Sequence, residues 1–501
     1  MAKVRIKGGS TLKVLKRAVV LACLVALVPF PAAGPVAGAV QGVEVEGEHS
    51  PNMKHIKNIN YKAANGGDPN AGTDIEFVTL NGRQYALGGS YDNGMQIVDI
   101  TNPRAAEVKA VYDCGVTQGD IQVFKQSDKP GRTFVTYTSD TYGDGTSTCY
   151  QEAAALGFDI KKSETRGKNG TFIVDITKPL QPKTVSFVEV PKGSHNQTVH
   201  PGGRYLYNSN SDLITSAVLS NPSIEVFDIQ DFSKPRLVTE IDLPIRPGLG
   251  TESHDITFNN DGSRAYSAAL SQQVIINTKR PTEPKIVSSF IDPAINVFHQ
   301  SDPVTLKVDG NTREFLIIED EFVGALQTAQ CPNGGVHVYD ITGANEQDPV
   351  KVGYWNIDEV RPSIDGGMRC TAHVFDIHQK EGIMTIAFYN GGVRVVDLKG
   401  LVGVSLGETQ LSGGMKQIGF YQFSDSDSWA AKTPKIARDG DFFLYGNDLS
   451  RGMDIYHFDA GGEKSKNKGR FMSPTEAELY LSKNVGEIPA DYEMVCLIPQ
   501  R

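Results

Sequence analysis

Short apolar runs that end in an aspartate recur along this chain. The clearest copies are residues 94–103 (GMQIVDITNP) and 170–179 (GTFIVDITKP). Their apolar residues are β-branched or aromatic, and a turn containing proline follows, which is typical of a β-strand. We expect each aspartate to accept hydrogen bonds from that turn. Weaker copies follow at residues 223–229, 274–277, 335–342, 392–398 and 452–457.

A second pattern, a hairpin, precedes most copies of the repeat. Residues 74–87 place Asn81-Gly82 between two apolar runs, and residues 255–266 do the same with Asp261-Gly262. Asn-Gly and Asp-Gly favour the positive φ angles of tight hairpin turns. Each unit therefore contains a hairpin, the repeat strand and an outer strand, which is the content of a propeller blade. Seven units predict an all-β fold, a seven-bladed β-propeller with a short C-terminal helical tail.

The repeat strand resembles the LVIVD repeat, which occurs in bacterial surface or secreted propellers and is named for its Val-Ile-Val-Asp core. The resemblance extends from Asp74 to Asp459 and weakens where Asn277 and His457 replace the aspartate. It implies a propeller fold and export. No single reaction belongs to the family, so function has to be argued from the site.

The amino-terminal segment predicts export. Residues 1–39 carry six basic residues and no acidic ones, with an apolar run at 18–30. That run of about thirteen residues is too short for a membrane span, which needs about twenty, and it indicates a secretory signal peptide cleaved near Ala39. The protein is then secreted. The expected organisation is a signal peptide at 1–39, an N-terminal extension at 40–72, a propeller at 73–465 and a C-terminal tail with a short helix at 466–501.

The net charge and the cysteine content indicate which binding partners and which cellular compartment to expect. Without the leader, 43 basic residues face 59 acidic ones, a formal net charge of about −16, which argues against a nucleic-acid partner. We expect a monomer without a membrane span that binds a protein or a glycan. In an exported chain cysteines form disulfides, and their places predict the pairs Cys114–Cys149 and Cys331–Cys370, with Cys496 as a buried thiol.

Four histidines share one register. Aligning the hairpins places a histidine at the entry of the innermost strand in blades three to six: His195, His254, His299 and His373. The innermost strands of a propeller line its central channel, so these side chains are expected to converge. Neutral imidazole suits Zn, Cu and Fe, so the four histidines are the predicted ligands of a transition metal. The alternative is structural, with each histidine bonded to the backbone of a neighbouring blade.

Carboxylates accompany these histidines. They either follow them in sequence or end the second strands of the blades: Asp255, Asp302, Asp376, Asp92, Asp140, Glu319, Asp320, Glu321 and Asp448. Such acceptors orient metal-bound imidazoles, and they suit Ca²⁺ as an alternative ion. Asp255 and Glu319 are the candidate catalytic bases.

Two classes of function remain open. The favoured one is a binding scaffold that uses top-face loops and the central channel. The alternative is a metal-dependent oxidoreductase or hydrolase with the four-histidine site at the channel mouth. That ligand set resembles the site of the iron-binding carotenoid-cleaving oxygenases, which are seven-bladed propellers, but no other motif of that family is found in the sequence.

Overall fold

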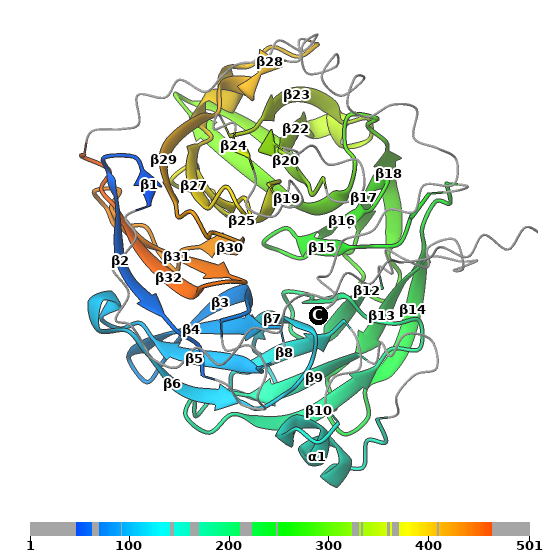
Figure 1. Cartoon of the computed structure of the whole chain (residues 1–501). Coiled ribbons are helices and arrows are strands. Elements are labelled where there is room, and N and C mark those ends of the chain that lie inside the picture. Colours follow the sequence, from blue (N-terminus) through cyan, green and yellow to red (C-terminus); the bar gives the residue numbers. More distant parts are fainter. Residues whose placement is uncertain are drawn as a thin grey trace, which may run out of the picture. The chain divides into compact units, whose positions relative to one another are not determined.

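Seven sheets of mainly antiparallel strands surround one central axis (Figure 1). The computed structural model describes residues 47–62, 70–91, 93–140, 145–160, 170–210, 223–246, 249–322, 330–331, 334–357, 361–362, 370–407 and 410–462. All the sheets belong to one compact unit, which extends from Glu46 onward. The seven-bladed all-β propeller is thereby confirmed.

The blades follow one another in chain order, each beginning at the axis. Blade one contains β3 (Gly72–Leu80), β4 (Arg83–Ser90), β5 (Met95–Asp99) and β6 (Glu107–Tyr112). Blade two contains β7 (Gln118–Phe124), β8 (Phe134–Ser139), β9 (Gly170–Asp175) and β10 (Lys183–Glu189). Blade three contains β11 (Asn196–Val199), β12 (Tyr205–Ser209), β13 (Ser223–Asp228) and β14 (Arg236–Asp242). Blade four contains β15 (Asp255–Phe258), β16 (Arg264–Ala269), β17 (Gln272–Asn277) and β18 (Lys285–Phe290).

Blades five and six each have a fifth strand, and blade seven takes its outer strand from the amino-terminal part of the chain. Blade five contains β19 (Phe298–Val308), β20 (Asn311–Asp320), β22 (Val336–Asp340), β23 (Val350–Trp355) and a parallel β28 (Gln410–Leu411). Blade six contains β25 (His373–His378), β26 (Ile383–Ala387), β27 (Val393–Asp397), β29 (Lys416–Gln422) and β1 (Glu48–His49). Blade seven contains β30 (Ser428–Lys432), β31 (Phe442–Asp448), β32 (Gly452–Phe458) and β2 (Met53–Ile59). The smaller elements are β21 (Gln330–Cys331) paired with β24 (Arg361–Pro362), the α-helix α1 (Thr148–Ala155), and the 3-10 helices η1 (Pro103–Ala105), η2 (Gly343–Glu346), η3 (Lys399–Gly403) and η4 (Ser412–Gly414).

The predicted repeat strand is the third strand of every blade. These strands are β5, β9, β13, β17, β22, β27 and β32. Their aspartates hold the following turn as expected: the side chain of Asp99 accepts from the backbone N–H of Thr101 at 3.0 Å, and that of Asp175 from Thr177 at 2.8 Å. The apolar residues of the repeat are buried because they pack between neighbouring blades.

The core consists of apolar layers between the blades. Between blades five and six, for example, Phe315 and Ile317 of β20 pack in one cluster with Met384 and Ile386 of β26, and all four are fully buried. This packing fixes the spacing of the innermost strands around the axis.

The amino-terminal strands close the ring. β2 pairs antiparallel with β32 and supplies the outer strand of blade seven, and β1 pairs with β29 of blade six (Figure 1). The propeller therefore begins before residue 73, the boundary expected from the sequence. The repeat pattern could not reveal β2, because this outer strand is only partly buried and reads MKHIKNI.

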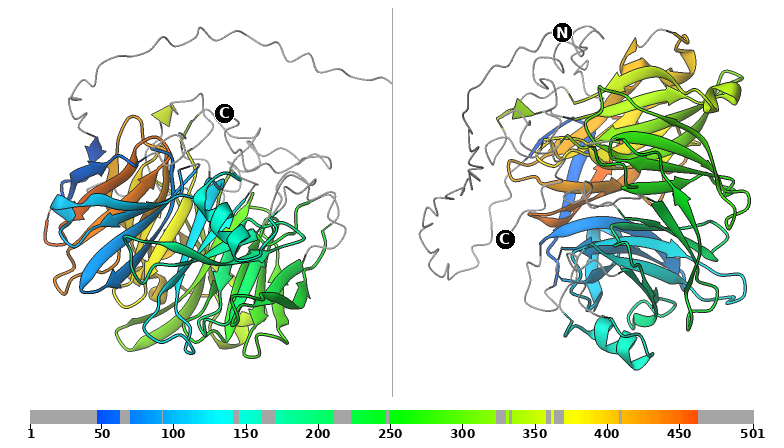
Figure 2. Two further views of the ribbon diagram at one scale, coloured as in Figure 1. Left: turned by 90° about the horizontal axis from the view of Figure 1, so that it is seen from below. Right: turned by 90° about the vertical axis from the view of Figure 1, so that its right-hand side faces the viewer.

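One predicted disulfide is present. Cys114 and Cys149 are bonded, with 5.1 Å between their Cα atoms, and the bond ties α1 to the segment that enters blade two. α1 belongs to the insertion of that blade and lies at the outer edge of the ring (Figure 2). Cys370 is also disulfide-bonded.

Several expectations fall outside the described residues. They are the signal peptide at 1–39, the tail at 466–501 with its helix, Asp92, Cys496 and the side chain of Cys331. No helix in the described ranges has the length and apolar character needed to cross a membrane.

Asp454 is expected to hold the closing strand. Its carboxylate contacts His55 at 2.7 Å and Asn58 at 3.0 Å, both in β2, and Arg451 at 2.7 Å. Burial raises the pKa of Asp454, but hydrogen bonds from His55 and Arg451 outweigh it, so the pKa lies below its ordinary value. The stabilisation is therefore complete above the unfolded pKa of about 3.9 and is lost as the pH falls through the folded pKa.

Asp454→Asn should lower the free energy of unfolding at pH 7 by roughly 3 kcal/mol, because it breaks a buried ion pair. Urea unfolding measures the change, with Asp348→Asn, at an exposed position, as the matched control. Equal stability of the two variants would show that the Asp454 contacts do not hold β2.

Cys331 is expected to be the partner of Cys370. Peptide mapping of the unreduced protein should give one cross-linked peptide that joins these two cysteines and a second that joins Cys114 and Cys149. A Cys370–Cys496 peptide would instead show that the tail, and not the blade-five insertion, is tied to the entry of blade six.

Candidate metal centre

The four predicted histidines lie side by side at the axis. His195 and His254 directly precede β11 and β15, His299 is the second residue of β19, and His373 opens β25. Adjacent rings follow in the order 195, 254, 299 and 373 with centroid separations of 4.1, 4.1 and 4.5 Å. All four residues are at most 5% exposed. The common register found in the sequence therefore brings the imidazoles together.

Each imidazole has an acceptor at its Nδ1 atom. For His254 and His373 the acceptors are backbone carbonyls, of His299 at 3.2 Å and of Trp429 at 2.6 Å. A carbonyl only accepts, so in these two rings Nδ1 carries the proton and Nε2 carries the lone pair. The acceptors for the other two rings are carboxylates, Asp140 for His195 at 3.0 Å and Glu319 for His299 at 2.6 Å.

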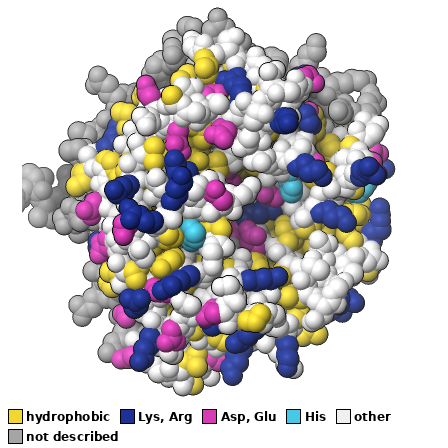
Figure 3. Space-filling model, turned by 180° about the vertical axis from the view of Figure 1, so that it is seen from behind, with side chains coloured by type: hydrophobic (Ala, Val, Ile, Leu, Met, Phe, Trp, Pro, Cys, Tyr) yellow, Lys and Arg dark blue, Asp and Glu magenta, His cyan; other side chains and the backbone are white. Residues whose placement is uncertain are grey.

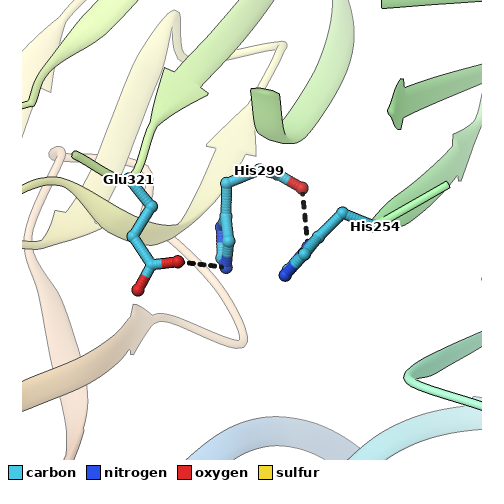
Figure 4. Close-up of side chains that lie close together, drawn as sticks. All are labelled: His254, His299 and Glu321. Atoms are coloured by element: carbon cyan, nitrogen blue, oxygen red, sulfur yellow. Dashed lines mark hydrogen bonds and ion pairs between the residues drawn. The ribbon is translucent and has the colours of Figure 1, made fainter. Parts of the chain in front are cut away.

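Glu321 completes the group. It follows β20 and is 1% exposed; its Oε2 lies 3.3 Å from Nε2 of His299, and its Oε1 lies 3.6 Å from Nε2 of His373. Tyr389 donates its hydroxyl to Oε1 of Glu321 at 2.6 Å. His254, His299 and Glu321 each offer one ligand atom, and these atoms lie within 4.8 Å of one another (Figure 4). Ligand atoms at about 2.0–2.2 Å from one ion lie at most about 4.4 Å apart, so a bound metal ion would draw these three side chains slightly closer together.

The group that could hold a metal consists of His254, His299 and Glu321, and it differs from the predicted set of four histidines. It contains Glu321, which the sequence suggested only as an orienting acid, and His195 and His373 flank it. Glu319, a candidate base, orients His299 instead. Asp255, the other candidate base, lines the cavity below and accepts from the N–H of Ile256 at 2.7 Å.

Two of the remaining acids hold loops. Asp320 accepts from the N–H groups of Asn296 and Val297, and Asp448 accepts from that of Asp427. Sequence reasoning missed Tyr389. The available signal was its place after the second strand of blade six, where Glu321 stands in blade five.

Burial keeps two of the imidazoles, those of His299 and His373, neutral. It lowers the pKa of His373 to about 3, and burial together with the neighbouring imidazoles holds the pKa of His299 well below its usual value. Burial, with Glu321 and Asp320 nearby, raises the pKa of Glu319 well above its usual range. Neutral imidazole is the form that binds a metal, and a bound cation would lower the pKa of the surrounding carboxyl groups.

A cavity of about 250 Å³ connects the histidines to polar side chains further along the channel. Its lining includes all four histidines, Trp429, Lys432 and a set of aspartate and glutamate residues. Acidic side chains gather near the centre of the face opposite to that of Figure 1 (Figure 3). The cavity beside the histidines is therefore lined mainly by polar and acidic side chains.

Comparisons with known proteins add the following. No protein-family model and no curated protein matches the chain. Among solved structures, it is similar to a functionally unknown protein from Desulfotomaculum acetoxidans DSM 771, with 14% identity over 71% of this chain and 91% of that one and a TM-score of 0.41. The LVIVD resemblance stays a prediction.

The buried neutral histidines should make the metal-free protein less stable in acid. The unfolded chain binds a proton at His373 below about pH 6.5 and the folded chain does so only near pH 3, so stability falls with pH between these values. From pH 7 to pH 5 this group should account for a loss of about 2 kcal/mol. His373→Asn should show a correspondingly shallower loss in urea unfolding; an unchanged pH dependence would mean that His373 is protonated in the folded state.

Proposed function

We propose that the protein is a metal-dependent enzyme whose ligands are His254, His299 and Glu321. The observation that carries the proposal is the buried group of two imidazoles and one carboxylate with ligand atoms within 4.8 Å. Catalytic metal sites combine three protein ligands with an open position for water or substrate. His195 and His373 flank this group and are the candidates to complete a four-histidine set.

The donor set favours some metals over others. Two histidines and one carboxylate are typical of non-haem iron(II) oxygenases and of catalytic zinc. Ca²⁺ prefers oxygen ligands throughout, so the imidazole nitrogens argue against it. A bound iron would support oxidoreductase chemistry, and a bound zinc would activate water for hydrolysis.

The protein's own residues preorganise the site. Glu319 and Asp140 fix the rings of His299 and His195, and the Trp429 carbonyl fixes that of His373. Tyr389 fixes Glu321 through one carboxylate oxygen. Such outer contacts usually change metal affinity by about 10–100-fold when removed.

A binding scaffold, favoured from the sequence alone, also fits a β-propeller. The enzyme is preferred here because the interior brings ligand atoms of His254, His299 and Glu321 within 4.8 Å of one another. Nε2 of His373 is buried without a hydrogen-bond partner among the described residues, and such a group costs about 1–3 kcal/mol. A ligand in the cavity would remove that cost.

Export is part of this proposal. The basic and apolar leader at 1–39 and the Cys114–Cys149 bond both support it, since disulfides persist in oxidising compartments. The enzyme would then act outside the cytoplasm.

Metal analysis of protein purified without chelator tests the proposal. The wild type should contain about one Fe or Zn per chain, whereas Glu321→Gln and His254→Ala should lose most of it, because each removes one of the few ligands. Glu314→Gln, at an exposed position in β20, is the matched control and should keep the metal. A folded wild type that takes up neither metal, even after loading, would contradict the proposal.

A further inference from the structure

The cavity below the histidines is strongly acidic. Six carboxylates line it, in two layers of the inner strands: Asp74, Asp120 and Asp255, then Glu76, Asp302 and Asp376. Among the described lining residues, Lys432 is the one lysine or arginine. Burial raises the pKa of Glu76, Asp120, Asp255 and Asp302, that of Asp302 to about 7. A cation bound among these carboxyl groups would favour their ionised form, whereas an anion would be repelled.

Lys432 shows that the carboxylates of this cavity can bind an ammonium group. Its ammonium nitrogen lies 2.9 Å from Oδ1 of Asp74 and 2.8 Å from Oε1 of Glu76, and the side chain is 14% exposed. One alkylammonium group, supplied by the chain itself, is thus already held between a carboxylate of each layer.

Asp302 and Asp376 provide a second pair of carboxyl groups in the cavity lining, and no lysine that the structure describes occupies this pair. Asp302 accepts from the hydroxyl of Thr257 at 2.6 Å and from the amide of Gln300 at 3.3 Å, and Asp376 contacts His378 at 3.0 Å. Neither carboxylate pairs with a lysine or an arginine in the described part of the chain. These two acids, from neighbouring blades, form an acidic wall that can hold a second ammonium group.

Apolar and polar groups continue from this wall to the metal centre. Phe77 and Trp429 line the cavity, and the Trp429 ring lies 4.4 Å from that of His373. An aromatic face attracts a cation and also contacts apolar carbon. Nε2 of His373, which has no hydrogen-bond partner among the described residues, lies at the end of the same cavity.

We propose that the channel binds a small primary organic ammonium ion as the substrate of the metal site. Its ammonium group lies at Asp302 and Asp376, and its carbon chain lies along Trp429 toward the histidines. That the ammonium ion is a substrate rests on the proposed function, whereas its binding can be tested independently of the metal.

The probe is n-butylammonium, with n-butanol and butyrate as neutral and anionic analogues of similar size. Isothermal titration should show saturable binding of butylammonium to the wild type, at least tenfold weaker binding of butanol, and no binding of butyrate. Asp302→Asn combined with Asp376→Asn should weaken butylammonium at least tenfold, and Asp302→Asn alone should weaken it less. Asp348→Asn, on the surface, should bind as the wild type does.

Several outcomes would overturn the proposal. These are equal binding of butanol and butylammonium, unchanged binding by the folded double variant, or full competition by sodium ions at equal concentration. The metal content of the same samples separates the two claims: a metal-loaded wild type that ignores butylammonium contradicts this inference alone. Butylammonium binding by a chain that takes up no metal leaves the channel as an ammonium site and contradicts the enzyme.

Discussion

Antiparallel pairing of β2 with β32 is the interaction on which the arrangement depends, because it closes seven sheets into a ring. Closure fixes where each innermost strand stands relative to the axis, and the apolar layers between blades fix the spacing. A residue at one register position is then presented at the same height by every blade. The site is a consequence of that geometry rather than of any one loop.

Closure of the ring brings the four histidine side chains together at the axis. Four consecutive blades each supply one imidazole, and each ring is held at Nδ1 by a carbonyl or a carboxylate. Burial keeps His299 and His373 neutral at ordinary pH. The protein therefore maintains, at some cost in stability, a set of lone pairs that suits a metal and an acidic cavity that suits a cation.

The sequence predicted the features that recur. The third strands were found because they are buried on both faces and so read as apolar runs, and the histidines because all four occupy the same place in their units. β2 was not found, because an outer strand such as MKHIKNI is half exposed and lacks the repeat pattern. Glu321 and Tyr389 were not assigned to the centre because their approach depends on distances between blades five and six, which register does not provide.

A crystal structure of the protein loaded with Fe(II) or Zn²⁺, with anomalous scattering measured at the metal edge, tests the central claim most directly. The account predicts one strong peak at about 2.0–2.2 Å from a ring nitrogen of His254, a ring nitrogen of His299 and a carboxylate oxygen of Glu321. A peak at another place, or none at this group of side chains despite full loading, would contradict it.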